Sequence, residues 1–236
     1  MSQLKKQIID LIKRNRISSV EVSDALGKTG VLKGLIPLVP KKFAVGEARY
    51  IYAHSCSNWT IHEQAQGLLE GGLLFVDTFD CEDHAVFGDI VAKYLLLYKG
   101  YEGIIVNGAV RDVHSLIKED YPIWSTGVTP LGCHNRKVDL SHENQRKANI
   151  GMSLFEGSII VADDSGCTCI SHDMITQATL TRLEFIELQE DIWYYCLDTL
   201  KWSTYKIICE KAYLKDKDAL PESLRIRLSN YLSLYQ

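Results

Sequence analysis

An arginine and an aspartate stand side by side at Arg111-Asp112, and a second aspartate follows a glycine at Gly88-Asp89. Aspartate carboxylates are hard oxygen ligands suited to Mg²⁺ or Mn²⁺. The planar guanidinium of Arg111 can pair with a carboxylate through two parallel hydrogen bonds. The amide N–H groups of a helix that opens at Gly88 can hold a further carboxylate. Together these residue types describe a site for a divalent metal and a small carboxylated substrate.

Both segments stand where the chain is expected to pass into a helix. Residues 104–106 form a short apolar strand that leads to a predicted helix over about 112–118, and residues 89–98 have helical periodicity directly after a loop. In a parallel α/β sheet, such positions lie at the carboxyl ends of strands, where these folds bind ligands. We therefore expect the two segments to meet at one edge of a sheet.

Helix capping is an alternative explanation for the same side chains. Asp89 and Asp112 each stand where an N-cap aspartate belongs. Arg111 beside Asp112 can equally be a surface ion pair that contributes little stability. Isolated histidines are more often exposed or internally satisfied than ligands. For that reason we assign no role to the nearby histidines His84, His114 and His134.

The remaining elements supply a framework for this edge. Strand, helix, strand, helix, strand within residues 73–125 predicts a parallel sheet with crossover helices. An amphipathic helix near the N-terminus, a second helix with a cap signal at Ser18, and a hairpin over 158–170 are also predicted. We predict a single domain over residues 1–214, which includes the N-terminal helices, and a C-terminal helical tail over residues 215–236.

Composition and charge exclude several classes of protein. Of the 236 residues, 46% are hydrophobic and 24% are charged, as in ordinary globular proteins. No apolar run approaches the roughly 20 residues of a membrane span, and the formal charge of −4 gives no general affinity for nucleic acid. Seven cysteines without a C-x-x-C pair, and no secretory signal, indicate reduced thiols. We expect a cytoplasmic protein with neither nucleic acid nor membrane as its partner.

Residues 88–113, with their Gly-Asp and Gly-Ala-Val-Arg-Asp motifs, closely resemble the RraA-like family. That family includes the regulator of ribonuclease activity A and the 4-hydroxy-4-methyl-2-oxoglutarate aldolases, which also decarboxylate oxaloacetate. Residues 22–26 and 157–166 resemble further family segments in the same order, so the resemblance covers about residues 20–190. It implies an α/β fold with the three-layer β/β/α swivelling-domain architecture, here with an N-terminal helical segment and a C-terminal helical extension.

The resemblance also implies roles for individual residues. Arg111 would bind and orient the substrate as a catalytic residue, and Asp112 would bind the divalent cation, Mg²⁺ or Mn²⁺. Asp89 would hold a metal-bound water. Backbone groups would contact the substrate at Gly88, Asp89, Ile90 and Val91. The family assembles as a homotrimer or homohexamer with sites between subunits, and an acidic residue from a neighbour helps some members; the candidates here are Glu184, Glu187 and Glu190.

The expected activity is that of a metal-dependent lyase acting on 2-oxo acids. Retro-aldol cleavage of a 4-hydroxy-4-methyl-2-oxoglutarate-type substrate and decarboxylation of oxaloacetate both leave the enolate of pyruvate, whose charge a divalent cation stabilises. The alternative is a non-catalytic regulator that binds a ribonuclease or another RNA-processing enzyme. The regulator branch tends to lack an acid at the position of Asp112, so the presence of Asp112 favours the lyase.

One departure from the family pattern concerns spacing. The 21 residues between Asp89 and Arg111 are one more than the aldolase pattern has. An additional residue in the helix exit at 98–103 would leave both ends of the segment in place. We therefore predict a loop insertion there.

Overall fold

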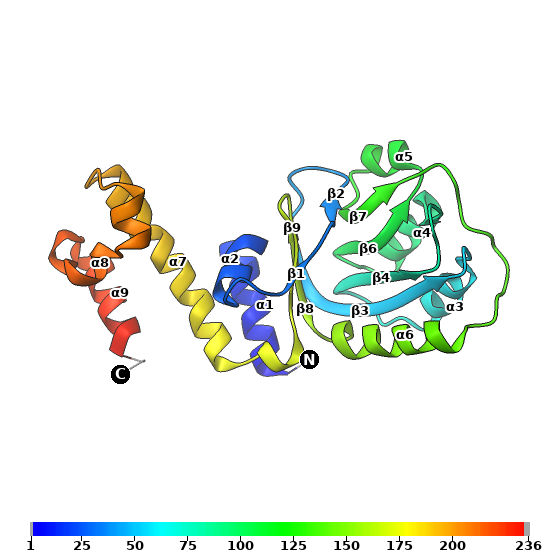
Figure 1. The fold of residues 1–236 in the computed structure, drawn as a ribbon, viewed down its shortest axis with the longest axis horizontal. Coiled ribbons are helices and arrows are strands. Elements are labelled where there is room, and N and C mark those ends of the chain that lie inside the picture. The colour runs from blue at the N-terminus through cyan, green and yellow to red at the C-terminus, as the bar shows by residue number, and fades with distance from the viewer. Residues whose placement is uncertain (1, 234–236) are drawn as a thin grey trace. The chain divides into compact units, whose positions relative to one another are not determined.

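The computed structural model describes residues 2–233, and Figure 1 shows its elements. The chain divides into two compact units, Met1–Thr176 and Gln177–Gln236, which we describe separately. The sequence-based boundary at 214/215 falls inside the second unit. The division lies earlier because the long helix that begins at Gln177 shares an apolar core with the helices that follow it.

A mixed sheet runs through the first unit, in the order β1-β9-β8-β3-β4-β6-β7-β2, with β5 paired to β6. Its strands within residues 2–233 are β1 (Val31–Leu32), β2 (Ile36–Pro37), β3 (Ala44–His54), β4 (Leu73–Phe79), β5 (Ala85–Phe87), β6 (Gly103–Val110), β7 (Ile123–Val128), β8 (Ile159–Asp163) and β9 (Gly166–Ile170). Strands β3, β4, β6 and β7 are mutually parallel. The predicted parallel sheet is therefore confirmed, as is the hairpin of β8 and β9.

Strand β3 belongs to two parts of this sheet. Its residues 44–47 pair antiparallel with β8, and its residues 48–54 pair parallel with β4. Figure 1 shows β8 and β9 turned across the direction of β4, β6 and β7. One apolar cluster contains side chains from both parts, among them Phe75, Ile105 and Trp124 from the parallel strands and Ile160 and Cys169 from the hairpin. The two β layers thus share one core.

Helices cover the other face of the parallel strands. They are α3 (Trp59–Gly67), α4 (Asp89–Lys93) with the π-helical turn Tyr94–Tyr98, and α5 (Val113–Lys118). Leu95 and Leu116 from these helices pack with Val76 and Ile104 of the sheet in a second apolar cluster. Hairpin, parallel sheet and helices form the three layers that the sequence predicts.

The N-terminal helices form as expected. They are α1 (Gln3–Asn15) and α2 (Ser19–Ala25). Ser18 accepts a hydrogen bond from the amide of Glu21, and the Glu21 carboxylate accepts one from the amide of Ser18 at 2.7 Å. This reciprocal capping box satisfies two amides that a helix start otherwise leaves unpaired.

In the described part of the first unit, two helices were not predicted from the sequence, α3 and α6 (His142–Phe155). Helix α6 lies along β3 (Figure 1), and it fully buries the small or polar residues Asn144, Ala148 and Gly151, while Phe155 at its end packs on the apolar cluster. A single large apolar side chain at the end of a helix gives no visible hydrophobic periodicity. Gly151 lets the helix approach Tyr50 of β3 closely.

The additional residue between Asp89 and Arg111 has a place in the helix as well as in its exit. The segment Tyr94–Tyr98 is a π-helical turn, in which the amide of Lys99 donates to the carbonyl of Tyr94 at 3.1 Å. A π turn contains one residue more than an α turn for the same hydrogen-bond closure. The π turn is therefore one place where an additional residue fits, and the loop insertion at 98–103 stays a prediction.

The second unit is helical. Within the part of the chain that the structure describes, it contains α7 (Gln177–Asp198), the π-helical turn Tyr205–Cys209, α8 (Ala212–Lys215) and α9 (Glu222–Ser233), besides short 3₁₀ turns such as Lys217–Ala219. Leu188, Ile192, Tyr213 and Leu228 form its core, and Phe185 of α7 stacks on Tyr231 of α9 with ring centroids 4.0 Å apart. None of the helices described in residues 2–233 is long and apolar enough to cross a membrane.

Replacing Gly151 with alanine should destabilise the first unit by about 1–3 kcal/mol. The new Cβ would lie 2.1 Å from the Tyr50 hydroxyl oxygen, so the helix or the ring has to move. The matched control is Gly67→Ala near the end of α3, where a Cβ enters open space and the free energy of unfolding should rise by up to about 1 kcal/mol. Urea denaturation measures both changes, and a Gly151→Ala protein as stable as the parent would contradict the packing described here.

Candidate active site

The segments that carry Gly88-Asp89 and Arg111-Asp112 lie next to each other. Strand β5 pairs in parallel with the end of β6, with Ala85 opposite Ala109 and Phe87 beside Val110. The amide of Arg111 donates to the carbonyl of Phe87 at 3.1 Å. Both strands end at the same edge, so the structure brings together the four residues that the sequence singled out there.

The Asp112 side chain does not cap its own helix. Asp112 occupies the N-cap position of α5 with left-handed backbone angles (φ 57°, ψ 31°), and among residues 2–233 its carboxylate accepts from no α5 amide. Its Oδ2 atom instead accepts a hydrogen bond from the amide of Asp89 at 3.3 Å. Asp89 is likewise the first residue of α4 rather than its cap, a position held by Gly88. Neither aspartate therefore caps the helix that it precedes or begins, and the Asp112 carboxylate instead accepts from the first amide of α4.

Two glycines make room for the charged side chains. A Cβ on Gly88 would lie 2.0 Å from Oδ2 of Asp112, and a Cβ on Gly132 would lie 2.3 Å from Nη1 of Arg111. Gly132 belongs to the loop after β7, which is held to the sheet by a hydrogen bond from the Ala85 amide to the carbonyl of Leu131 at 2.8 Å. Sequence reasoning missed Gly132, because nothing near it in the chain marks it as a neighbour of Arg111.

The site is a small open cavity of about 150 Å³, with Gly88, Asp89, Arg111 and Asp112 among its lining residues. The Arg111 and Asp112 side chains are 47% and 39% exposed, and Nε of Arg111 lies 3.7 Å from Oδ2 of Asp112. An ion pair this exposed contributes at most about 1 kcal/mol. The close glycine contacts, more than mutual attraction, set the positions of these two groups.

The start of α4, with Ile90 and Val91, lines the cavity. Ile90 is 81% exposed, and Val91 packs partly against the apolar cluster under the helix. The amides of Ile90 and Val91 lie in the first helical turn, where a helix has no internal acceptor for them. Such amides can donate to a bound carboxylate.

The residues at this edge suit a hard cation that keeps much of its water shell. Asp112 offers a carboxylate, and Asp89 lines the same cavity. Within residues 2–233, neither belongs to a set of three close His, Cys, Asp or Glu donors. Mg²⁺ is commonly bound by one or two carboxylates together with water and substrate oxygens. The donor set fits that mode of binding.

A sequence profile of the RraA-like family, described as Aldolase/RraA, matches residues 19–169, which is well over half of the chain. The chain belongs to the RraA-like family. Its matched region contains both Gly88-Asp89 and Arg111-Asp112 and ends in β9. The resemblance carried by the motifs at 88–113 is thereby confirmed.

Two curated relatives are 29% identical to the RraA-like chain. The first is protein DlpA of Legionella pneumophila, aligned over 182 residues, which are 74% of this chain and 29% of that protein. The second, from Halalkalibacterium halodurans, bears the name "Putative 4-hydroxy-4-methyl-2-oxoglutarate aldolase" and aligns over 167 residues, 69% of this chain and 77% of that protein. The chain therefore spans under a third of the length of DlpA and most of the length of the second relative.

Solved structures share the RraA-like fold. An uncharacterised protein from Pseudomonas syringae superposes with a TM-score of 0.64 at 20% identity, over 87% of this chain and 98% of that one. Streptomyces coelicolor RraAS2, described as an unusual member of the RNase ES inhibitor RraA protein family, gives a TM-score of 0.61 at 21% identity, over 78% of this chain and 96% of that one. At these identities the similarity establishes the fold.

The three glutamates considered for a neighbouring site, Glu184, Glu187 and Glu190, all lie on α7 in the second unit. Their contribution to another subunit stays a prediction. All seven cysteines lie within the described residues and are free thiols, as the sequence predicts.

Replacing Gly88 with alanine should displace the Asp112 carboxylate without unfolding the chain. The backbone of Gly88 is extended (φ −137°, ψ −152°), so alanine can adopt it, and the effect comes from the 2.0 Å approach to Oδ2. The Asp89 amide then loses its acceptor, and its proton resonance should move upfield in a ¹H–¹⁵N spectrum. Gly127→Ala on the adjacent β7, where a Cβ meets open space, is the control. An unchanged Asp89 resonance in Gly88→Ala would refute the contact.

Proposed function

We propose that this RraA-like protein is a divalent-metal-dependent carbon–carbon lyase for small 2-oxo acids. The reactions are retro-aldol cleavage of 4-hydroxy-4-methyl-2-oxoglutarate-type substrates, decarboxylation of oxaloacetate to pyruvate, or both. The observation that carries the proposal is the Asp112 carboxylate, which is directed to the start of α4 beside Arg111 instead of capping its own helix. The aldolase name of the Halalkalibacterium relative supports the same reaction class.

Each residue at the cavity has a separate task in this proposal. Asp112 would hold Mg²⁺ or Mn²⁺, an ion that supplies Lewis-acid stabilisation of the pyruvate enolate. Arg111 binds the substrate carboxylate through its planar fork and fixes the orientation of the bond that breaks. The amides of Ile90 and Val91 donate to substrate oxygens, and the Asp89 carboxylate orients water and accepts or returns a proton. Since no lysine is needed as a Schiff base, the exposed Lys93 of α4 has no part in the reaction.

A non-catalytic regulator of an RNA-processing enzyme is the competing function. The observation in its favour is the fold that the chain shares with Streptomyces coelicolor RraAS2, described as belonging to a family of RNase ES inhibitors. A regulator that acts through its outer surface has no need for a carboxylate and a guanidinium in one cavity beside two glycines that leave room for them. The arrangement at Asp112 therefore favours the lyase.

Oxaloacetate decarboxylation in the presence of Mg²⁺ or Mn²⁺ tests the proposal through two variants. Asp112→Asn keeps the shape of the side chain but removes its charge, so kcat/KM and Mn²⁺ affinity should each fall at least about 100-fold. Arg111→Lys keeps the charge but loses the fork, so Mn²⁺ binding should persist while kcat/KM falls about 10- to 100-fold. Pyruvate release and Mn²⁺ titration measure the two effects.

Asp120→Asn is the matched control for this experiment. Asp120 is also an exposed aspartate with left-handed backbone (φ 58°), and it pairs with Lys42 away from the cavity. Its variant should keep full activity and full metal dependence. An active Asp112→Asn protein with normal metal dependence would refute the assignment of Asp112 to the metal site. The absence of metal-stimulated pyruvate release from the parent protein, with oxaloacetate and with the aldol substrate, would favour the regulator.

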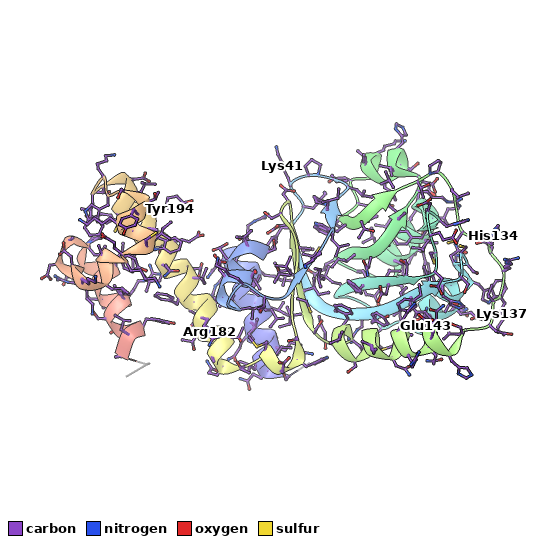
Figure 2. All side chains as sticks on the ribbon, in the orientation of Figure 1. Lys41, His134, Lys137, Glu143, Arg182 and Tyr194 are labelled. Carbon is purple, nitrogen blue, oxygen red and sulfur yellow. The ribbon has the colours of Figure 1, made fainter. Side chains whose placement is uncertain are left out.

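We also propose that the protein assembles as a homotrimer or homohexamer. The second unit exposes the apolar side chains of Tyr194 and Leu197 on α7 and of Tyr205 and Ile208 on the π-helical turn, and Figure 2 shows Tyr194 projecting from α7. Contiguous apolar surface of this kind is usually buried in an assembly.

Light scattering should therefore give a mass of three or six times 26.7 kDa. Glutamate at position 194 or 205 should shift the assembly toward smaller species if the second unit takes part in it, because a buried charge is costly. A stable monomer of the parent chain at micromolar concentration would contradict the assembly and any role for a glutamate of a neighbouring subunit.

A further inference from the structure

Three side chains typical of metal ligands lie together outside the site described above. The Cys56 thiol, the Glu82 carboxylate and a ring nitrogen of His84 all lie within 4.8 Å of one another. Cys56 follows the end of β3, and the other two belong to the loop between β4 and β5. Because β3 and β4 are parallel neighbours, the segments that leave them meet at one edge of the sheet.

Backbone hydrogen bonds hold these segments in place. The Cys56 amide donates to the carbonyl of Asp80 at 3.1 Å, which continues the pairing of β3 with β4 beyond the strands. The His84 amide donates to the carbonyl of Cys81 at 2.9 Å and so closes the turn that returns His84 toward Cys56. From the other side, the amide of His134 donates to the carbonyl of Cys56 at 2.8 Å, and Figure 2 labels His134 at this end of the first unit. These hydrogen bonds thus fix the backbone that carries the three candidate metal ligands.

The His84 ring has an unsatisfied nitrogen. Its Nδ1 atom is buried and has no hydrogen-bond partner among the residues that the structure describes. A buried polar atom left unpaired costs about 1–3 kcal/mol. A neutral imidazole nitrogen is also the commonest metal-binding group in proteins. An ion bound through this nitrogen would remove the penalty.

The thiol of Cys56 and the carboxylate of Glu82 lie within reach of one ion. A divalent ion bound between the sulfur and the carboxylate would exchange the thiol proton for the metal.

We propose that Cys56, Glu82 and His84 form a second metal site, for a borderline-soft divalent ion of the Zn²⁺ class. Thiolate and imidazole ligands select such ions over Mg²⁺, which prefers oxygen. Ligand atoms of a tetrahedral zinc ion lie roughly 3 to 4 Å apart, and the exposed Glu82 side chain can close the remaining gap. Three protein ligands leave the fourth position for water or another ligand.

A metal ion bound at this site would link two segments of the chain. It would join the exit of β3 to the loop that leads through β5 to Gly88 and Asp89. The loop contains the left-handed residues Asp80 and Glu82, whose conformations an unligated chain must hold by hydrogen bonds alone. A bound ion would therefore stabilise the segment that enters the candidate active site.

Cobalt binding to the full-length, chelator-treated protein tests the proposal. Co²⁺ is the probe because a cysteine thiolate ligand gives it a charge-transfer band in the near ultraviolet. The parent protein should bind one Co²⁺ at this site with that band, Zn²⁺ should displace it, and a large excess of Mg²⁺ should not. Cys56→Ser should abolish the band, and Glu82→Gln should keep it while lowering Co²⁺ affinity at least about tenfold.

Two controls separate this site from other thiols and from the proposed activity. Cys209→Ser removes an exposed thiol of the second unit and should leave the band unchanged. Asp112→Asn should also leave it unchanged, so that failure of the lyase proposal and failure of this one are distinguishable. Cys81 is a poor substitute ligand, since its thiol is buried and does not belong to the cluster of donors described above.

The proposal is overturned by a parent protein without the band, or by a band that survives in Cys56→Ser. If Cys56→Ser does not fold, Glu82→Gln decides the matter, because the Glu82 side chain is exposed and its amide preserves the shape. Unchanged Co²⁺ affinity in Glu82→Gln would then count against the site, and a tenfold loss would support it.

Discussion

Strand β3 pairs with strands of both β layers, and the first unit depends on this constraint. Its first residues complete the hairpin layer and its later residues begin the parallel layer, so the two layers cannot shift independently. Charged groups on this strand also hold other elements. The Glu47 carboxylate accepts a hydrogen bond from Lys5 of α1 at 2.7 Å, and Arg49 contacts Glu156 at the end of α6 at 3.1 Å. Burial alone would raise the pKa of Glu47, but Lys5 and Arg49 outweigh it and lower that pKa below its ordinary value.

The parallel order that β3 begins also explains why residues far apart in the sequence converge. Cys56, the loop after β4, Gly88 and Arg111 all follow strands that run in one direction and end at one edge. One edge of the sheet therefore carries both the cavity around Asp112 and the donor set at Cys56. If both proposals hold, this edge combines a hard, oxygen-based metal site with a softer one based on sulfur and nitrogen.

Much of this arrangement could be predicted from sequence, because apolar strands and a capping box are recognisable from short stretches of sequence. Helix α6 could not be predicted, since its fully buried residues Asn144, Ala148 and Gly151 are small or polar and Phe155 packs on the core only at its end. The meaning of Asp112 was also undecided in the sequence: a capping aspartate and a ligand aspartate occupy the same position before a helix. In the structure, Asp112 has left-handed backbone angles and accepts from the Asp89 amide, so it does not cap its own helix, and metal binding by Asp112 is a proposal. The sequence gives His84 no role, because Cys56 lies far from it in the chain. Only the folded sheet brings the two side chains close together.

The π-helical turn Tyr94–Tyr98 has a consequence for how this fold tolerates change in chain length. A residue gained in an α-helix rotates everything after it by about 100 degrees unless the surplus is taken up locally. Here the widened turn after Lys93 can take up a surplus residue, and β6 pairs with β4 in unbroken register. A change in chain length between them would thus leave the positions of the first turn at Asp89 and of the Arg-Asp pair at the end of β6 unchanged. A π bulge of this kind can accommodate an additional residue in a helix while the surfaces at the two ends of the helix keep their positions.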